Sequence, residues 1–308
     1  MKKLIIFFML LIAIAHAGRA QQRTVQSLYM FDPLLLNPAV AGNHLQLSTT
    51  SIYRNQWVNF PGAPKTFTLA THMGFKQNRV GLGLIVGKDQ IGIHGETSLY
   101  FAYSYRLPMS RMDKSSYLSF GVQGGFNSMQ SDYTLTISRE DDKFGVFRTF
   151  NPNVGAGLYY KHKNGYIGFS VPYFLNSEIL NVQSAFESSA RRYRYYYLTA
   201  GFTKKLSKEV KLVPSALIRM QDKAPLSFDA TLITVLYDAV GLGVSYRYGD
   251  SLIGLFELQL NNNFHVGYGY DFTASDIRTF SNGTHEIMLN YRIKITKFHQ
   301  GLECPSYY

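Results

Sequence analysis

The chain has 308 residues, of which 46% are hydrophobic and 17% charged, and it carries a formal net charge of +11. Its single cysteine, Cys304, excludes an intrachain disulfide, so the fold must be held by burial and strand pairing. After the first 20 residues every apolar stretch is soon broken by a charge, a polar residue or a glycine, which excludes membrane-spanning helices.

The first 20 residues have the three parts of a secretory signal peptide. Lys2 and Lys3 precede a short apolar run, residues 4–15, and small residues follow it. We expect cleavage after Ala20, with a second candidate site after Ala17; cleavage after Ala20 leaves a net charge of +8, three less than the full chain. An exported chain does not ordinarily meet nucleic acid, so the basic charge favours lipopolysaccharide or an acidic partner.

Residues 21–43 do not alternate as a strand does. Pro33, Pro38 and Gly42 surround an apolar run of three leucines at residues 34–36. We expect this N-terminal periplasmic segment to plug or brace the periplasmic mouth of the fold that follows.

From residue 44 onward apolar and polar residues alternate with a period of two, which is the period of a β-strand. In residues 286–296 one face carries Ile, Leu and Tyr, and the other carries Glu, Met, Asn, Arg and Lys. Residues 240–249 and 264–272 repeat the pattern, with glycine and polar or charged residues on the second face. A soluble sandwich shares the period, but this composition is typical of a transmembrane barrel, which is apolar outside and polar inside.

Fourteen such segments predict an all-β fold, a single transmembrane antiparallel β-barrel over residues 44–297. The even number places both termini in the periplasm, so residues 298–308 form a periplasmic tail. We expect the last strand to close the barrel by pairing with the first near residues 45–53. The segments are residues 44–54, 65–76, 79–89, 94–107, 115–129, 150–162, 165–175, 191–205, 209–220, 225–237, 239–249, 251–262, 263–275 and 283–297.

The connections between these segments alternate in length. The loops at residues 55–64, 130–149 and 176–190 are long, whereas residues 77–78 and 163–164 form tight turns. Short periplasmic turns and longer external loops are characteristic of bacterial outer-membrane barrels. The sequence therefore predicts an exported protein of the Gram-negative outer membrane, in contact with outer-membrane lipid.

The sequence shows no motif for catalysis or cofactor binding. The histidines lack HxxxH or HExxH spacing, and the glycine pairs at residues 81–83 and 241–243 lie inside strands, where glycine indicates close packing or a bend. A barrel phospholipase, which needs a serine and a histidine set for nucleophilic attack, is the enzymatic alternative. We expect no enzyme, no cofactor and no metal site. The scattered histidines are His72, His94, His162, His265, His285 and His299.

Charged residues on the polar face of the segments are expected to line the lumen. They can pair across the interior and stiffen a medium-sized barrel, or they can select ions or solutes in an open bore. The sequence allows both. The candidate lumen charges are Arg54, Arg106, Arg247, Arg292, Lys294, Glu96, Asp229, Glu257 and Glu286.

Motifs near both ends of the chain are more specific than the period of two. Residues 29–42, YMFDPLLLNPAVAG, are followed by YRNQW at residues 53–57 and GAPKT at residues 62–66. VGLG lies at residues 80–83 and CP at residues 304–305. These motifs resemble those of the PorP/SprF family of Bacteroidota outer-membrane proteins.

The resemblance implies a function that composition and periodicity do not indicate. It implies a part in the type IX secretion and gliding apparatus, as a barrel that supports secretion or surface attachment of cargo proteins, such as adhesins, with a C-terminal targeting domain. Some family members also bind periplasmic, peptidoglycan-associated partners. The alternative function is an outer-membrane porin or solute channel, which would require an open lumen.

The candidate binding site for cargo or another partner is the run Tyr53, Arg54, Asn55, Gln56 and Trp57. Arginine combined with aromatic residues is typical of binding hot spots. The run also lies where the first strand should reach the outer interface, so Trp57 could instead anchor in the aromatic belt of the membrane. Separate changes at Arg54 and Trp57 would distinguish these two roles.

Overall fold

The computed structural model describes residues 26–44, 46–75, 79–109, 116–132, 145–175, 177–178, 191–192, 194–221 and 224–294. The expected signal peptide, the first residues of the expected mature chain and the expected tail with Cys304 lie outside the described residues. In the part of the chain that is described, no helix is long and apolar enough to cross a membrane.

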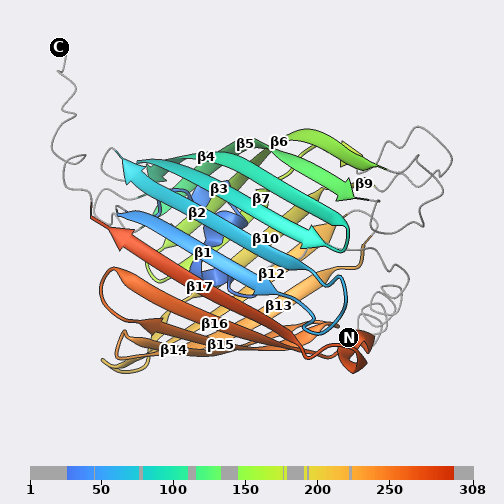
Figure 1. Ribbon diagram of the computed structural model, residues 1–308. Coiled ribbons are helices and arrows are strands. Elements are labelled where there is room, and N and C mark those ends of the chain that lie inside the picture. Colours follow the sequence, from blue (N-terminus) through green and yellow to red (C-terminus); the bar gives the residue numbers. More distant parts are fainter. Residues whose placement is uncertain are drawn as a thin grey trace, which may run out of the picture.

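Fourteen antiparallel strands close into one barrel, which confirms the predicted fold (Figure 1). The strands are β1 (Leu47–Asn55), β2 (Lys65–Phe75), β3 (Val80–Ile91), β4 (His94–Pro108), β5 (Tyr117–Asp132), β6 (Val146–His162), β7 (Gly165–Val171), β10 (Tyr195–Phe202), β12 (Val210–Gln221), β13 (Ser227–Leu236), β14 (Val240–Arg247), β15 (Ser251–Gln259), β16 (Phe264–Thr273) and β17 (Thr284–Ile293). The short β11 (Lys204–Lys205) also pairs with β12, while β8 (Ser177–Glu178) and β9 (Arg191–Arg192) form a separate two-stranded sheet.

The last strand closes the barrel against the first, as the sequence predicts. β17 pairs with β1 from Leu47, opposite Ile293, to Asn55, opposite His285. β1 also pairs with β2, and the sheet continues around to the β10–β12 pairing. Closure removes the exposed strand edges that lipid does not tolerate.

Outward and inward side chains differ in burial along the strands. On β17 the outward Ile287, Leu289 and Tyr291 are between 43% and 48% exposed, whereas the inward Glu286 and Met288 are almost completely buried. The exposed apolar residues form the outer wall, which is the surface suited to lipid. The inward side chains face the lumen, where the N-terminal segment lies.

One end of the barrel carries most of the long connections. Residues 56–64 and 274–283 lie at the end where β1 finishes, as do the end of β5 and the start of β6, whereas residues 163–164 and 237–239 form short turns at the end where β1 begins. We call these the long-loop end and the short-turn end. Their contrast agrees with the predicted alternation of tight turns and long loops.

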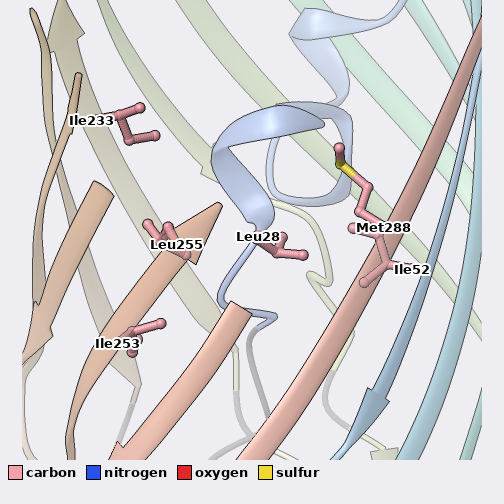
Figure 2. Packing of buried hydrophobic residues seen from close by; sticks show 6 residues of the cluster. All are labelled: Leu28, Ile52, Ile233, Ile253, Leu255 and Met288. Atoms are coloured by element: carbon pink, nitrogen blue, oxygen red, sulfur yellow. The ribbon is translucent and has the colours of Figure 1, made fainter. Parts of the chain in front are cut away.

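The N-terminal segment lies inside the barrel. Residues 26–43, which we call the plug segment, run through the lumen as three 3-10 helices, η2 (Tyr29–Phe31), η3 (Pro33–Leu35) and η4 (Pro38–Val40) (Figure 1). The hydrophobic core lies between this segment and the wall. Leu28 of the plug segment belongs to one cluster of this core (Figure 2), with Ile52, Ile233, Ile253, Leu255 and Met288 from the wall.

Two Asx-Pro pairs explain the local shape of the plug segment. The Asp32 carboxylate accepts a hydrogen bond from Leu34 N at 3.2 Å, and Asn37 Oδ1 accepts one from Ala39 N at 2.9 Å. In each pair the second residue is a proline, which suits the first position of a helix because no N–H is needed there. Short helical turns therefore begin at defined points in the segment.

Several strands are shorter than the sequence predicts, and the reason is clear for β7. Strand was expected over residues 165–175, but β7 ends before the proline at residue 172. Pro172 cannot donate to a ladder, and its carbonyl accepts a hydrogen bond from the buried Gln123 Nε2 at 2.9 Å. Tyr173 packs edge-on against the buried Tyr100, with ring centroids 5.2 Å apart. The chain therefore turns out of the wall and into the lumen.

Candidate functional site

The plug segment crosses the lumen from one end to the other. Near the long-loop end, the Ser27 hydroxyl donates to the two carboxylate oxygens of Asp271, at 2.8 and 2.9 Å. Near the short-turn end, the Ala41 carbonyl accepts hydrogen bonds from the Ser104 hydroxyl, at 2.7 Å, and from the Arg106 guanidinium. The beginning of the plug segment and the beginning of β1 therefore lie at opposite ends of the barrel.

The Glu286 carboxylate binds the backbone at the beginning of the plug segment. Glu286 Oε2 accepts a hydrogen bond from Ser27 N at 2.7 Å, and Glu286 Oε1 accepts one from Leu28 N at 2.9 Å. Arg54 Nη1 lies 2.8 Å from the same carboxylate. The glutamate is 0% exposed, so these donors supply the partners that a buried charge requires. The plug segment is thus fixed directly to the closing strand β17.

This carboxylate belongs to a row of alternating charges on the inner wall, which we call the charge belt. Its three arginines and three carboxylates have opposite formal charges that cancel, and each residue is at most 7% exposed. The charge belt comprises Arg219 on β12, Asp229 on β13, Arg247 on β14, Asp271 on β16, Glu286 on β17 and Arg54 on β1.

Short distances connect the members of the charge belt. Arg54 lies 2.8 Å from Asp271, which in turn lies 3.8 Å from Arg247. Arg247 and Arg219 then share Asp229, at 3.1 and 3.0 Å. Buried ions are tolerated only when they are paired and hydrogen-bonded, so the belt acts as one compensated network rather than as a set of free charges.

A different part of the wall holds the plug segment through serines. The Ser119 hydroxyl donates to the Ala39 carbonyl and the Ser170 hydroxyl donates to the Leu36 carbonyl, both at 2.7 Å, in the same way as Ser104. The backbone hydrogen bonds within the plug segment use other carbonyls, such as those of Pro33 and Asn37. These serines therefore satisfy carbonyl groups whose burial would otherwise be costly.

Inward glycines let the backbone of the plug segment touch the wall. A Cβ added at Gly81 would lie 1.9 Å from the Ala41 carbonyl oxygen, and one added at Gly121 would lie 2.1 Å from Ala39 N. Both contacts involve backbone atoms, so neither can be relieved by turning a side chain. By contrast, a Cβ at Gly124 would meet no atom within 4 Å. The predicted meaning of glycine in these strands, close packing, applies at Gly81.

The predicted lumen charges fall into two groups. Arg54, Arg247, Asp229 and Glu286 are brought together in the charge belt. The others lie nearer the mouths of the barrel. They are Glu96 toward the long-loop end and Arg106, Glu257, Arg292 and Lys294 toward the short-turn end.

Three residues that belong to the charge belt or bond to it were not singled out from the sequence. Asp271 occupies a polar position in an alternating strand, which indicates a lumen-facing residue but no partner. Arg219 lies on β12 beside the apolar Leu217 and Ile218, so alternation gives no signal there. Ser27 lies in residues 21–43, where apolar and polar residues do not alternate, so the sequence does not indicate which way its side chain points.

The structure separates the residues of the candidate binding run. Tyr53 points outward from β1 and is 43% exposed, whereas Arg54 is buried in the charge belt. Asn55 ends the strand, and Gln56 and Trp57 begin the loop that follows. A partner outside the barrel can therefore reach Tyr53 and Trp57 but not the guanidinium group of Arg54.

The first and last long loops are joined at the β1–β17 seam. Val58 N donates to the Gly283 carbonyl at 2.9 Å, and Asn282 N donates to the Val58 carbonyl at 3.0 Å. We call the joined loops, residues 56–64 and 274–283, the outer platform. Their two reciprocal bonds fix the loops relative to each other.

The outer platform exposes aromatic side chains at the long-loop end. Phe60 is 38% exposed and Phe280 is 70% exposed. The rings of Trp57 and Phe60 pack edge-on, with centroids 6.5 Å apart. Trp57 and Asn59 adopt left-handed backbone, with φ of 50° and 72°, and such strain in non-glycine residues clusters at binding sites.

A small cavity of about 90 Å³ lies between the plug segment and the wall, lined by plug residues such as Gln26 and Tyr29 and by wall residues such as Thr68. An apolar hollow of about 620 Å³ lies on the outer face of β3–β6, where Gly124 and Ala156 leave room.

Among the described residues, no three His, Cys, Asp or Glu side chains gather as a metal site.

Comparisons with known proteins point to an outer-membrane barrel. A family model described as "Type IX secretion system membrane protein PorP/SprF" matches residues 18–291. No curated protein matches the chain.

Solved structures of other barrels are similar in fold. The monoaromatic hydrocarbon channel CymD has a TM-score of 0.50 and 13% identity, covering 89% of this chain and 94% of that chain. The outer membrane protein Omp33 of Acinetobacter baumannii has a TM-score of 0.48 and 9% identity, covering 82% of this chain and 99% of that chain. At 13% identity the similarity to CymD concerns the fold alone.

Proposed function

The chain belongs to the PorP/SprF family of type IX secretion system membrane proteins, and on this premise we propose that it supports secretion or surface attachment of cargo proteins with C-terminal targeting domains. Its location is the outer membrane, as both the family and the barrel fold indicate. The family and the fold are those of a secretion-associated membrane protein rather than of a known enzyme.

The observation that carries the proposal beyond the family is the filled lumen. The plug segment buries Leu34, Leu36 and Val40 inside the barrel, each at most 5% exposed. The charge belt is neutral and each of its charges has an ion-pair partner, so it offers no free charge to attract an ion. A porin needs a continuous aqueous path. The barrel therefore serves as a fixed platform that presents loops rather than as a conduit.

We place the long-loop end outside the cell and the short-turn end in the periplasm, the usual arrangement of bacterial outer-membrane barrels. In this orientation the end of β17 is periplasmic, and a peptidoglycan-associated partner would meet the residues that follow it. The first residues of the plug segment instead lie toward the external end. The prediction that both termini are periplasmic concerns ends of the chain that lie outside the described residues.

Thiol labelling on intact cells tests this orientation. The single native cysteine is replaced (Cys304→Ser), and one cysteine is introduced either at the external end (Phe280→Cys) or at the periplasmic end (Lys208→Cys). A membrane-impermeant maleimide should label only the first variant until the outer membrane is permeabilised. If only Lys208→Cys were labelled on intact cells, the short-turn end would be the external end and the proposed orientation would be wrong.

Within this orientation, cargo contacts the outer platform. Phe60, Phe280 and Trp57 supply aromatic surface on loops that two backbone bonds hold in place, which keeps the entropic cost of binding low. The buried Arg54 contributes to the barrel instead of to the contact.

Conductance in planar bilayers separates this function from that of a porin or solute channel. The full-length barrel should show no steady open state, because the plug segment occupies the lumen. A steady, ohmic conductance from the folded protein would support the channel and contradict the proposal. In cells, a deletion strain should lose a surface adhesin and keep nutrient uptake; the reverse pattern would also support the channel.

Aromatic substitutions test the outer platform itself. The double variant Phe60→Ser/Phe280→Ser should lower the amount of cargo on the cell surface at least tenfold, since a loss of about 1 kcal/mol at each residue already weakens binding about thirtyfold. Tyr237→Ser, an exposed aromatic at the short-turn end, is the matched control. Arg54→Ala should reduce the amount of folded barrel rather than cargo per barrel. Wild-type cargo levels with an abundant Phe60→Ser/Phe280→Ser barrel would exclude the platform.

A further inference from the structure

The connections at the short-turn end carry a group of exposed cations, which we call the basic rim. Acidic residues are fewer on the described part of these connections: Glu209 and Asp238 are exposed, and Asp238 is already paired with Lys211. The rim is therefore basic after local pairing is counted. The exposed cations are Arg79, Lys163, Lys204, Lys205, Lys208 and Lys294.

The basic rim extends around the barrel. Arg79 precedes β3, Lys163 lies between β6 and β7, and Lys294 follows β17. The remaining three lysines lie at residues 204–208, next to β12. A folded acidic partner would contact a patch on one side, whereas these positions surround the mouth. Such a distribution fits an anionic surface that encircles the barrel.

Exposed apolar side chains accompany these cations at the tips of the turns. Leu206 is 55% exposed between the rim lysines, Tyr237 is 71% exposed in the next turn, and Leu260 is 56% exposed in the one after it. Aliphatic and aromatic side chains beside lysines at the ends of membrane-spanning strands are suited to the interface between headgroups and hydrocarbon. The turns therefore have the chemistry of a surface that touches lipid.

We propose that the basic rim binds the anionic phospholipid headgroups of the leaflet that surrounds the short-turn end. The lysine ammonium groups contact the headgroup phosphates, while Leu206 and Tyr237 enter the region below them. In the orientation proposed above this is the periplasmic leaflet. The attraction between lysine and anionic lipid is electrostatic and falls off within a Debye length, so added salt should weaken it.

The test measures which lipids surround the full-length barrel. The protein is assembled into nanodiscs from phosphatidylcholine with a minority of phosphatidylglycerol, and the lipids retained around it are quantified by mass spectrometry. The wild-type barrel should enrich phosphatidylglycerol about threefold or more over empty discs, less so at high salt. The triple variant Lys204→Gln/Lys205→Gln/Lys208→Gln should lose most of this enrichment.

Two further variants separate charge from structure. Replacement of the same three lysines by arginine should preserve the enrichment, since the charge is kept. A matched control removes three exposed cations at the long-loop end, as Lys88→Gln/Arg148→Gln/Arg278→Gln. This variant should leave the phosphatidylglycerol enrichment unchanged. Resistance of the folded barrel to detergent at room temperature verifies that each variant is folded.

Several outcomes would overturn the proposal. Equal phosphatidylglycerol content in discs with the wild-type barrel and in empty discs would exclude lipid binding at the rim. An equal loss of phosphatidylglycerol enrichment in the rim variant and in the long-loop control variant would exclude it as well. Discs that contain lipid A distinguish the other leaflet: a preference for lipid A that disappears in the rim variant would assign the rim to the outer leaflet. If the barrel bound an acidic protein but showed no preference for phosphatidylglycerol, the partner of the basic rim would be a protein and not a lipid. None of these readouts depends on cargo secretion, so this proposal and the proposed function fail separately.

Discussion

Two parts of the barrel wall hold the plug segment by different means. The part formed by β12–β17 and β1 supplies the charge belt, in which Glu286 accepts the first N–H groups of the plug segment. The part formed by β3–β7 supplies serines and inward glycines, so that the later plug residues place their backbone directly against the wall, as at Gly121. The first contact depends on charge and the second on shape.

This difference predicts different sensitivities to mutation. A buried ion that loses its partner remains in a medium of low polarity, and no small rearrangement restores its solvation. A change of shape costs only as much as the neighbouring backbone resists moving. Single changes in the charge belt should therefore destabilise the barrel more than single changes in the wall of small residues.

The largest effect is expected for Glu286→Ala. The substitution leaves Arg54 with one carboxylate partner fewer and leaves the N–H groups of Ser27 and Leu28 without acceptors. Removing one partner of a buried ion pair costs about 3–5 kcal/mol in the free energy of unfolding. Urea unfolding followed by tryptophan fluorescence measures this cost, because Trp57 is the only tryptophan and its backbone N–H donates to the Thr284 hydroxyl beside the seam.

The matched control for this variant is Glu257→Ala. Glu257 also faces inward from a strand, but its side chain is 22% exposed and its contact with His265 is 3.4 Å long, so its loss should cost about 1 kcal/mol or less. The double variant Arg54→Ala/Glu286→Ala should cost less than the two single losses added together, since no arginine is then left underpaired. A Glu286→Ala barrel as stable as Glu257→Ala would show that the charge belt does not hold the plug segment.

A smaller effect is expected for Gly121→Ala. The added Cβ would lie 2.1 Å from Ala39 N, so β5 and the plug segment must move apart, at a cost of about 1–3 kcal/mol. Gly124→Ala in the same strand is the control, because its Cβ meets no atom within 4 Å and alanine restricts the unfolded chain more than glycine does. The same urea experiment compares them. Equal stability of the two variants would mean that the plug segment does not press on this wall.

The barrel itself was predictable from the sequence because lipid imposes one rule on every strand. Apolar residues must point outward, so a period of two recurs from β1 to β17, and the closing pair could be expected before any contact was known. The ends of strands were less predictable, since local contacts decide them. β7 stops at Val171 because the following proline and Tyr173 bind inside the lumen.

The candidate site was predictable only in part. The period places Arg54 in the lumen, while its position in a motif with Trp57 suggests an external contact; burial in the charge belt supports the first interpretation. Its partner Asp271 lies far away in the sequence and becomes a neighbour only when the barrel closes. The period likewise places Gly121 on the inner face without showing that plug backbone lies against it. Contacts of this kind depend on the three-dimensional path of residues 26–43.

The smallest effect is expected for Ser119→Ala. The loss of one hydroxyl leaves the Ala39 carbonyl without this donor and should cost about 1 kcal/mol, whereas Ser128→Ala on the outer side of the same strand should cost less than about 0.5 kcal/mol. Joint replacement of Ser104, Ser119 and Ser170 by alanine decides how this wall works. If the three losses in the free energy of unfolding are additive, their total should be close to the loss in Glu286→Ala. The three serine hydrogen bonds would then stabilise the plug segment about as much as the one buried carboxylate. A total near that of Ser119→Ala alone would mean that the inward glycines, rather than the serines, hold the plug segment.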